Sequence, residues 1–242
     1  MSVWQSLAEF MGSYSERTGI AGSLANLLDP GNWLPGGRDA AFTLALVCLS
    51  AKMAVADGVV TASELRAFGQ TVDIPSGVEP QVQRVFELAQ QDVAGFDAYA
   101  RQIRRLFADS PDTLELVLDG LFHIAAADGM IHEAEFDYLK AVSDIFGFDD
   151  MRFEQIAARY LVRNGGSNPY LVLGLDRSAP DSEIRKVYIR LVAENHPDRL
   201  AAKGVPDELV ILMSQKLAAI NHAYDLIAEE RGLRQGKRLP SA

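Results

Sequence analysis

The spacing of apolar residues is the feature that most constrains the fold of this chain of 242 residues. In the middle of the chain these residues recur every three to four positions, as at Leu114, Leu118, Leu121 and Phe122. This spacing places them on one face of a helix. No convincing alternation of apolar and polar residues, which a half-buried strand requires, occurs between residues 39 and 163. We therefore predict an all-α fold.

Two breaks rich in glycine and proline divide the chain. Residues 34–37 are Leu-Pro-Gly-Gly, and residues 164–169 are Asn-Gly-Gly-Ser-Asn-Pro. Such stretches are typical of linkers. The predicted parts are an N-terminal segment at 1–37, a bundle of about seven helices at 38–163, a linker at 164–168, a helical hairpin domain at 169–234 and a tail at 235–242.

The net charge of −10 is unevenly distributed along the chain. Residues 1–164 hold 12 basic and 23 acidic residues, a net charge of −11, whereas the remaining residues hold 11 and 10, a net charge of +1. An acidic chain repels phosphate backbones, so we expect no nucleic acid partner. A basic cluster near the C-terminus is interpreted as a solvated tail rather than a nucleic acid site. Its members are Arg231, Arg234, Lys237 and Arg238.

The single cysteine and the uncharged stretches bear on the compartment. Cys48 excludes an intramolecular disulfide and a cysteine-based zinc site, and its apolar neighbours predict that it is buried. Uncharged stretches near the N-terminus are shorter than the ~18 residues that a membrane span needs, so no transmembrane helix is expected. An apolar stripe is expected on a short N-terminal helix, for contact either with a membrane surface or with the chain's own bundle. It comprises Val3, Trp4, Leu7, Phe10 and Met11.

The acidic bundle contains an internal repeat with an offset of 71 residues. Residues 56–60 are Ala-Asp-Gly-Val-Val, residues 127–131 are Ala-Asp-Gly-Met-Ile, and a glutamate follows each copy. Both copies predict a helix, an Asp-Gly turn and a second helix. Gly58 and Gly129 suit the left-handed conformation that ends a helix.

The acidic residues of the repeat have two interpretations, helix capping and a metal or partner site. The pattern matches the second half of an EF-hand loop, but the first half lacks side-chain oxygens, so neither copy is an EF-hand. Glu64 follows Thr61 in a capping box. His132, a poor cap, replaces the threonine in the second copy, which leaves Glu135 without that explanation. The candidate acidic site consists of Asp57, Glu64, Asp128 and Glu135.

Two long helices are predicted near the C-terminus, joined by a loop that begins with His196-Pro197-Asp198. The first is expected to begin with a capping box at residues 178–181 and to end before the proline. The second is expected to begin at residues 206–208. The predicted apolar stripes are Ile184, Val187, Tyr188, Leu191 and Val192 on the first helix, and Leu209, Leu212, Met213, Leu217, Ile220, Tyr224 and Ile227 on the second.

This segment resembles a J domain, the module that defines DnaJ-type co-chaperones. The resemblance rests on Tyr170 with Leu173-Gly174, on residues 183–191, on the His-Pro-Asp tripeptide and on residues 220–224. It implies a co-chaperone that docks on a DnaK-class chaperone and stimulates its ATP hydrolysis, without performing chemistry or needing a cofactor. It also implies that Arg185, Lys186 and Arg190 approach an acidic chaperone surface and that His196, Pro197 and Asp198 trigger the chaperone.

The central segment resembles the TerB-like domain of tellurite-resistance proteins, some of which bind divalent metal through acidic residues. With the order of the domains and Lys-Gly-Val-Pro at 203–206, the whole chain resembles the DjlA type of co-chaperone. The glycine-rich membrane segment of that type is eroded here, so we expect a cytoplasmic protein, with the cytoplasmic face of the inner membrane as the alternative. The bundle is expected to bind an unknown client or partner. The alternative function is a divalent-metal-binding stress-response module centred on the bundle.

Overall fold

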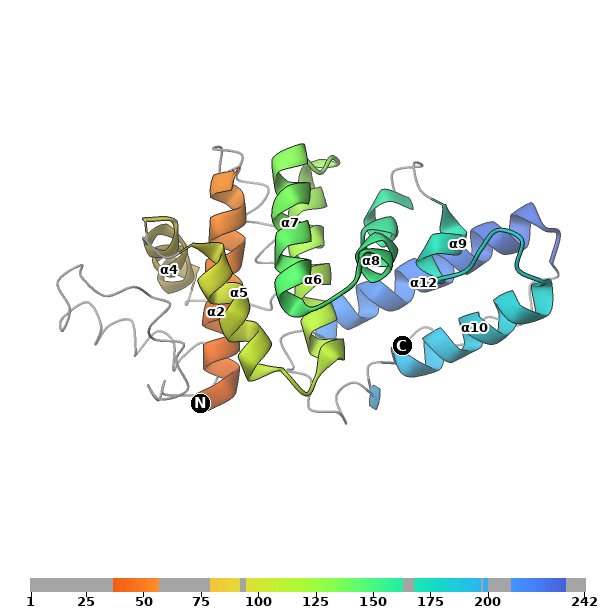
Figure 1. Cartoon of the computed structure of the whole chain (residues 1–242), viewed down its shortest axis with the longest axis horizontal. Helices are drawn as coiled ribbons and strands as arrows, with labels where there is room; N and C mark the ends of the chain where they lie inside the picture. Colours follow the sequence, from red (N-terminus) through yellow and green to blue (C-terminus); the bar gives the residue numbers. More distant parts are fainter. Residues whose placement is uncertain are drawn as a thin grey trace. The chain divides into compact units, whose positions relative to one another are not determined.

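The computed structural model describes residues 37–56, 79–91, 95–162, 168–196, 198–199 and 210–233 (Figure 1). All regular structure in these ranges is helical, which confirms the predicted all-α class. The chain divides into two compact units, Met1–Phe148 and Asp149–Ala242. Within the described ranges, no helix is both long and apolar enough to cross a membrane.

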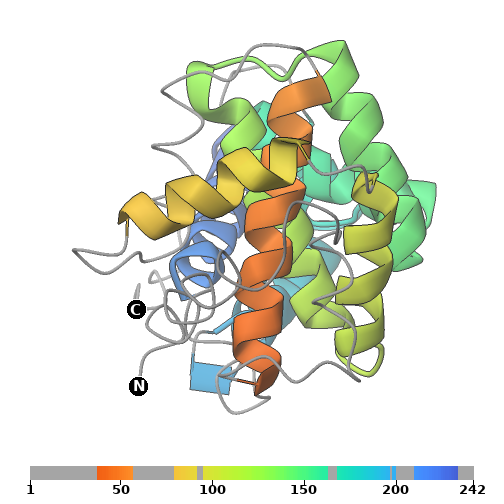
Figure 2. The ribbon, with the colours of Figure 1, turned by 90° about the vertical axis from the view of Figure 1, so that its left-hand side faces the viewer.

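The first unit is built around α2 (Gly37–Ala56). Its side chains from residue 43 to residue 51 are buried, and the burial of Cys48 confirms the prediction from its apolar neighbours. A helix that is buried on all sides needs other helices around it. Figure 2 shows α4 (Glu79–Gln91) crossing α2, with α5 (Phe96–Leu106) packed beside it.

The second copy of the repeat forms the predicted helix, turn and helix. It comprises α6 (Pro111–Ala125), the short 3-10 helix η2 (Ala126–Asp128) and α7 (Glu133–Phe146). Gly129 follows η2 with φ 99°, which confirms the predicted left-handed conformation. The apolar stripe predicted on α6 is buried. The Asp-Gly turn and the second helix of the first copy lie outside the described residues.

Tyr138 joins α7 to α2. Its hydroxyl donates a hydrogen bond to the carbonyl oxygen of Leu49 at 2.8 Å, and its ring centroid lies 4.6 Å from that of Phe96. Burial raises the pKa of Tyr138 well above its ordinary value, and nearby Cys48 raises it further. The phenol is therefore held neutral as a hydrogen-bond donor.

We predict that Tyr138→Phe lowers the free energy of unfolding by about 1 kcal/mol at pH 7, because one buried hydrogen bond is lost. The wild-type chain should also lose stability as pH rises above about 10, since tyrosine ionises there in the unfolded chain but not when buried. Urea unfolding followed by circular dichroism at pH 7 to 11 measures both effects. If the free energy of unfolding falls equally between pH 7 and pH 11 in the wild type and in Tyr138→Phe, the second expectation is contradicted.

The second unit contains α8 (Asp150–Val162), the short α9 (Pro169–Val172), α10 (Asp181–Glu194) and α12 (Val210–Glu230). Figure 1 shows α10 and α12 side by side, as the sequence predicts for a helical hairpin. The described residues of both predicted apolar stripes are buried or half-buried. The shared core consists of Ala158, Tyr170, Val172, Leu173, Ala179, Ile184, Val192, Leu217, Ile220, Ala223 and Ile227.

Within the second unit, helix α8 packs against α9 and α12. The side-chain amide of Gln155 donates to the carbonyl oxygen of Val172 at 3.2 Å, and Ala158 belongs to the shared core. Gly174 has φ 68°, and a Cβ there would come within 2.9 Å of the Gln155 amide nitrogen. The division between the units therefore precedes α8 and lies upstream of the linker predicted at 164–168.

We predict that a fragment spanning residues 149–233 unfolds at a higher temperature than one spanning 168–233, by several degrees, because only the longer one retains the contacts of α8. Thermal unfolding followed by circular dichroism compares the two. A fragment of 149–233 with Gln155→Ala should fall between them. Identical midpoints for the two fragments would show that α8 contributes nothing to the second unit.

Candidate partner-binding surface

The three predicted cations on α10 lie on its exposed side. Ile184 and Val192 are buried in the core, and the helical period places Arg185, Lys186 and Arg190 in solvent. None of these three side chains forms an ion pair with a residue in the part of the chain that the structure describes. Their charges are thus not neutralised by those residues.

The turn after α10 presents the first and third residues of the tripeptide. The side-chain amide of Asn195 donates to the carbonyl oxygen of Leu191 at 2.8 Å at the end of the helix. His196 Nδ1 then accepts a hydrogen bond from the backbone N–H of Asp198 at 3.3 Å. The side chains of His196 and Asp198 are 40% and 93% exposed, so both are accessible from solvent. Pro197 lies outside the described residues.

Contacts between α10 and α12 fix the rotation of α10 about its axis, and with it the direction of the cationic face formed by Arg185, Lys186 and Arg190. The rings of Tyr188 and Tyr224 stack with centroids 3.9 Å apart and planes at 10°. The Tyr188 hydroxyl donates to Asn221 Oδ1 at 3.0 Å. The sequence places both tyrosines on apolar stripes, but it does not reveal that they stack, because they are far apart in the chain.

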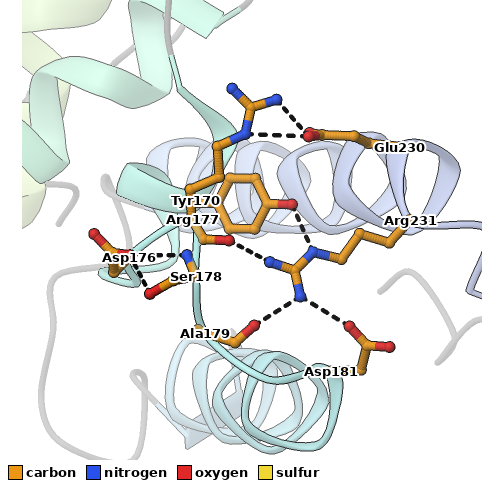
Figure 3. A network of polar contacts seen from close by, with 8 residues as sticks. All are labelled: Tyr170, Asp176, Arg177, Ser178, Ala179, Asp181, Glu230 and Arg231. Carbon is orange, nitrogen blue, oxygen red and sulfur yellow. Dashed lines mark hydrogen bonds and ion pairs between the residues drawn. The ribbon is translucent and has the colours of Figure 1, made fainter.

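Arg231 connects the end of α12 to the segment that precedes α10 (Figure 3). Its guanidinium donates to the hydroxyl of Tyr170 at 2.8 Å, to the carbonyl oxygen of Ala179 at 2.6 Å, to Asp181 Oδ1 at 2.8 Å and to the carbonyl oxygen of Arg177. The prediction that Arg231 belongs to a solvated tail is therefore wrong. The partners are 50 to 61 residues earlier in the chain, so no local pattern reveals them. The other basic residues of that tail, Arg234, Lys237 and Arg238, lie outside the described residues.

The start of α10 also differs from the predicted capping box. Both the backbone N–H and the hydroxyl of Ser178 donate to Asp176 Oδ1, at 2.8 and 2.6 Å. These hydrogen bonds hold the pKa of Asp176 below its usual range. The helix begins later, at Asp181 after Pro180, and the Asp181 carboxylate pairs with Arg231. Hydrogen bonds to Asp176 and the ion pair with Arg231 therefore form in place of the predicted capping box.

Two of the four acidic candidates lie in described residues, at the turn before α7. Glu135 Oε2 accepts the backbone N–H of His132 at 2.8 Å, so Glu135 does cap the helix. The expectation that His132 leaves it without that role is wrong, because any backbone N–H can supply this bond. Asp128 Oδ1 accepts the N–H of Met130 at 3.0 Å, and its other oxygen lies 3.6 Å from His132 Nε2.

The described residues include no group of three or more histidine, cysteine, aspartate or glutamate residues that could hold a metal ion. The other two candidates, Asp57 and Glu64, lie outside the described residues. A divalent metal at the acidic repeat therefore stays a prediction.

Comparisons with known proteins assign both parts of the chain. The family model for tellurite resistance protein TerB matches residues 43–158, and that for the DnaJ domain matches residues 168–233. The co-chaperone protein DjlA of Photobacterium profundum is 29% identical over 222 residues, which cover 81% of this chain and 80% of that protein. The co-chaperone protein DjlA of Coxiella burnetii is 30% identical over 200 residues, which cover 75% and 74%. The chain belongs to the DjlA family of co-chaperone proteins.

The structure adds detail to this DjlA architecture. The cationic face of α10 and the turn after it fall in the DnaJ domain match, which confirms the resemblance to a J domain. The TerB match ends inside α8, a helix that packs with the J domain. No solved structure matches the chain.

We predict that Arg231→Ala lowers the midpoint of thermal unfolding of this DjlA family member by several degrees, because it leaves the oxygens of Ala179 and Tyr170 without their donor. Arg177→Ala is the matched control, since Arg177 pairs with Glu230 in an ion pair whose arginine side chain is 71% exposed. Exposed ion pairs contribute little, so its effect should be much smaller. Equal shifts for both variants would contradict the assignment of Arg231 as the connection between these elements.

Proposed function

We propose that this chain docks on a DnaK-class chaperone through α10 and the following turn, and that it stimulates ATP hydrolysis by that chaperone. The observation that carries the proposal is that three exposed cations on one helix of the J domain are followed directly by an exposed His-x-Asp turn. Membership of the DjlA co-chaperone family supports it.

The cations supply the approach and the orientation. Arg185, Lys186 and Arg190 stand on consecutive turns of one rigid helix. A positive face of this kind accelerates association with an acidic surface and selects one orientation, and its effect weakens as salt rises. The basic face therefore governs how fast and in which direction the J domain meets its partner.

The turn supplies the trigger. A rigid element shifts a two-state partner only by binding one state better than the other. The hydrogen bond from the backbone N–H of Asp198 to His196 Nδ1 orients the backbone of the turn, from which the Asp198 carboxylate extends into solvent. The partner performs the hydrolysis, and this chain contributes binding energy rather than chemistry or a cofactor.

The acidic bundle binds the client or partner, or determines the location, of this co-chaperone. The protein acts in the cytoplasm. Residues 1–164, which contain the bundle, carry a net charge of −11, and this charge favours a basic surface on whatever the bundle binds. The single, buried Cys48 suits a reducing compartment.

The proposal predicts that His196→Gln removes most of the stimulation of ATP hydrolysis, by about tenfold or more, because it removes a side chain that we assign to the trigger. Single-turnover ATP hydrolysis by a DnaK-class chaperone, with the full chain added, measures this. The matched control is His222→Gln on α12, the same substitution at an exposed histidine away from the turn. Equal stimulation by both variants would overturn the proposal.

A further inference from the structure

An exposed apolar side chain lies among the cations of α10. Ile189 is 47% exposed, and it stands one turn after Arg185 and Lys186 and next to Arg190. Ala193, one further turn along on the same side, is exposed and small. The exposed face of the helix thus carries an isoleucine with cations around it and a small exposed residue on the side toward the turn.

Folding of the second unit does not explain an isoleucine at this position. The inner face of α10 is already occupied by Ile184 and Val192, which are buried. At an exposed helical position isoleucine is a poorer helix former than alanine, lysine or arginine. A single exposed apolar residue is unremarkable by itself, but this one lies at the centre of the face that we assign to a partner.

We propose that Ile189 is an apolar anchor of the docking face, received by an apolar depression within the acidic surface of the DnaK-class chaperone. This inference rests on the proposed function and adds a contact of a different physical kind. An apolar side chain enclosed by polar contacts loses its water on binding, and such central residues contribute most of the affinity in many interfaces. The surrounding cations fix orientation, and Ile189 slows dissociation.

The two kinds of contact respond differently to salt. Attraction between exposed charges is screened when the Debye length shortens, whereas burial of apolar surface is not weakened by screening. The loss caused by removing Ile189 should therefore persist at high salt, while the loss caused by removing Arg190 should shrink.

The test measures the chain concentration that gives half-maximal stimulation of the chaperone's ATP hydrolysis, with the full chain, at about 50 mM and about 300 mM salt. Ile189→Ala should raise this concentration about fivefold at both salt concentrations and leave the maximal stimulation unchanged. Arg190→Ala should raise it mainly at low salt. Because alanine favours helix, Ile189→Ala should retain the fold, which the thermal midpoint checks.

Met151→Ala is the matched control. Met151 is a more exposed apolar residue, at 75%, on α8 of the same unit but away from the docking face, and its removal should leave both parameters unchanged. Suppose that the wild type stimulates ATP hydrolysis, and that Ile189→Ala has the same half-maximal concentration or lowers only the maximal stimulation. The anchor is then overturned and the proposed function stands. If the wild type gives no stimulation, the proposed function fails, and this inference falls with it.

Discussion

The packing of α10 against α12 is the constraint on which the surface of the J domain depends. Ile184 and Val192 bury one side of α10, and the stack of Tyr188 on Tyr224 fixes its rotation. A helix held in this way must present its remaining positions outward, because its period is close to 3.6 residues. The cations are accordingly oriented by contacts that involve none of them.

At the end away from this turn, Arg231 fastens the hairpin, together with the exposed ion pair between Arg177 and Glu230. Arg231 follows α12 and bonds to groups on α9, on the loop and on the first residue of α10. Its bonds to Asp181 and Tyr170 raise its pKa further, and the guanidinium, which is charged in any case, keeps all its donors. Helix α8 covers the same domain from another side through Gln155 and Ala158. The J domain thus includes supports beyond the helices that carry its motif.

Local patterns predicted much of this molecule correctly, and the errors share a cause. The apolar stripes of α6, α10 and α12 were predictable because burial follows helical periodicity within one element. The capping box at Ser178 was wrong because Asp176 accepts the backbone N–H that the box would use. The solvated tail at Arg231 was wrong because oxygens distant in the chain accept hydrogen bonds from its guanidinium. Glu135 was misjudged because its partner is the backbone N–H of residue 132, which is available whatever side chain that residue carries.

The sequence by itself determined the all-α class, the resemblance of each segment to its family, the position of His196 and Asp198 after a helix, and the uneven charge. These properties depend on residue identity and short spacing alone. Tertiary structure decided that α8 packs with the J domain, that Arg231 joins three segments and that Ile189 remains exposed among cations. Each of these depends on which surfaces meet, and contacts between residues far apart in the chain are set by packing rather than by local periodicity.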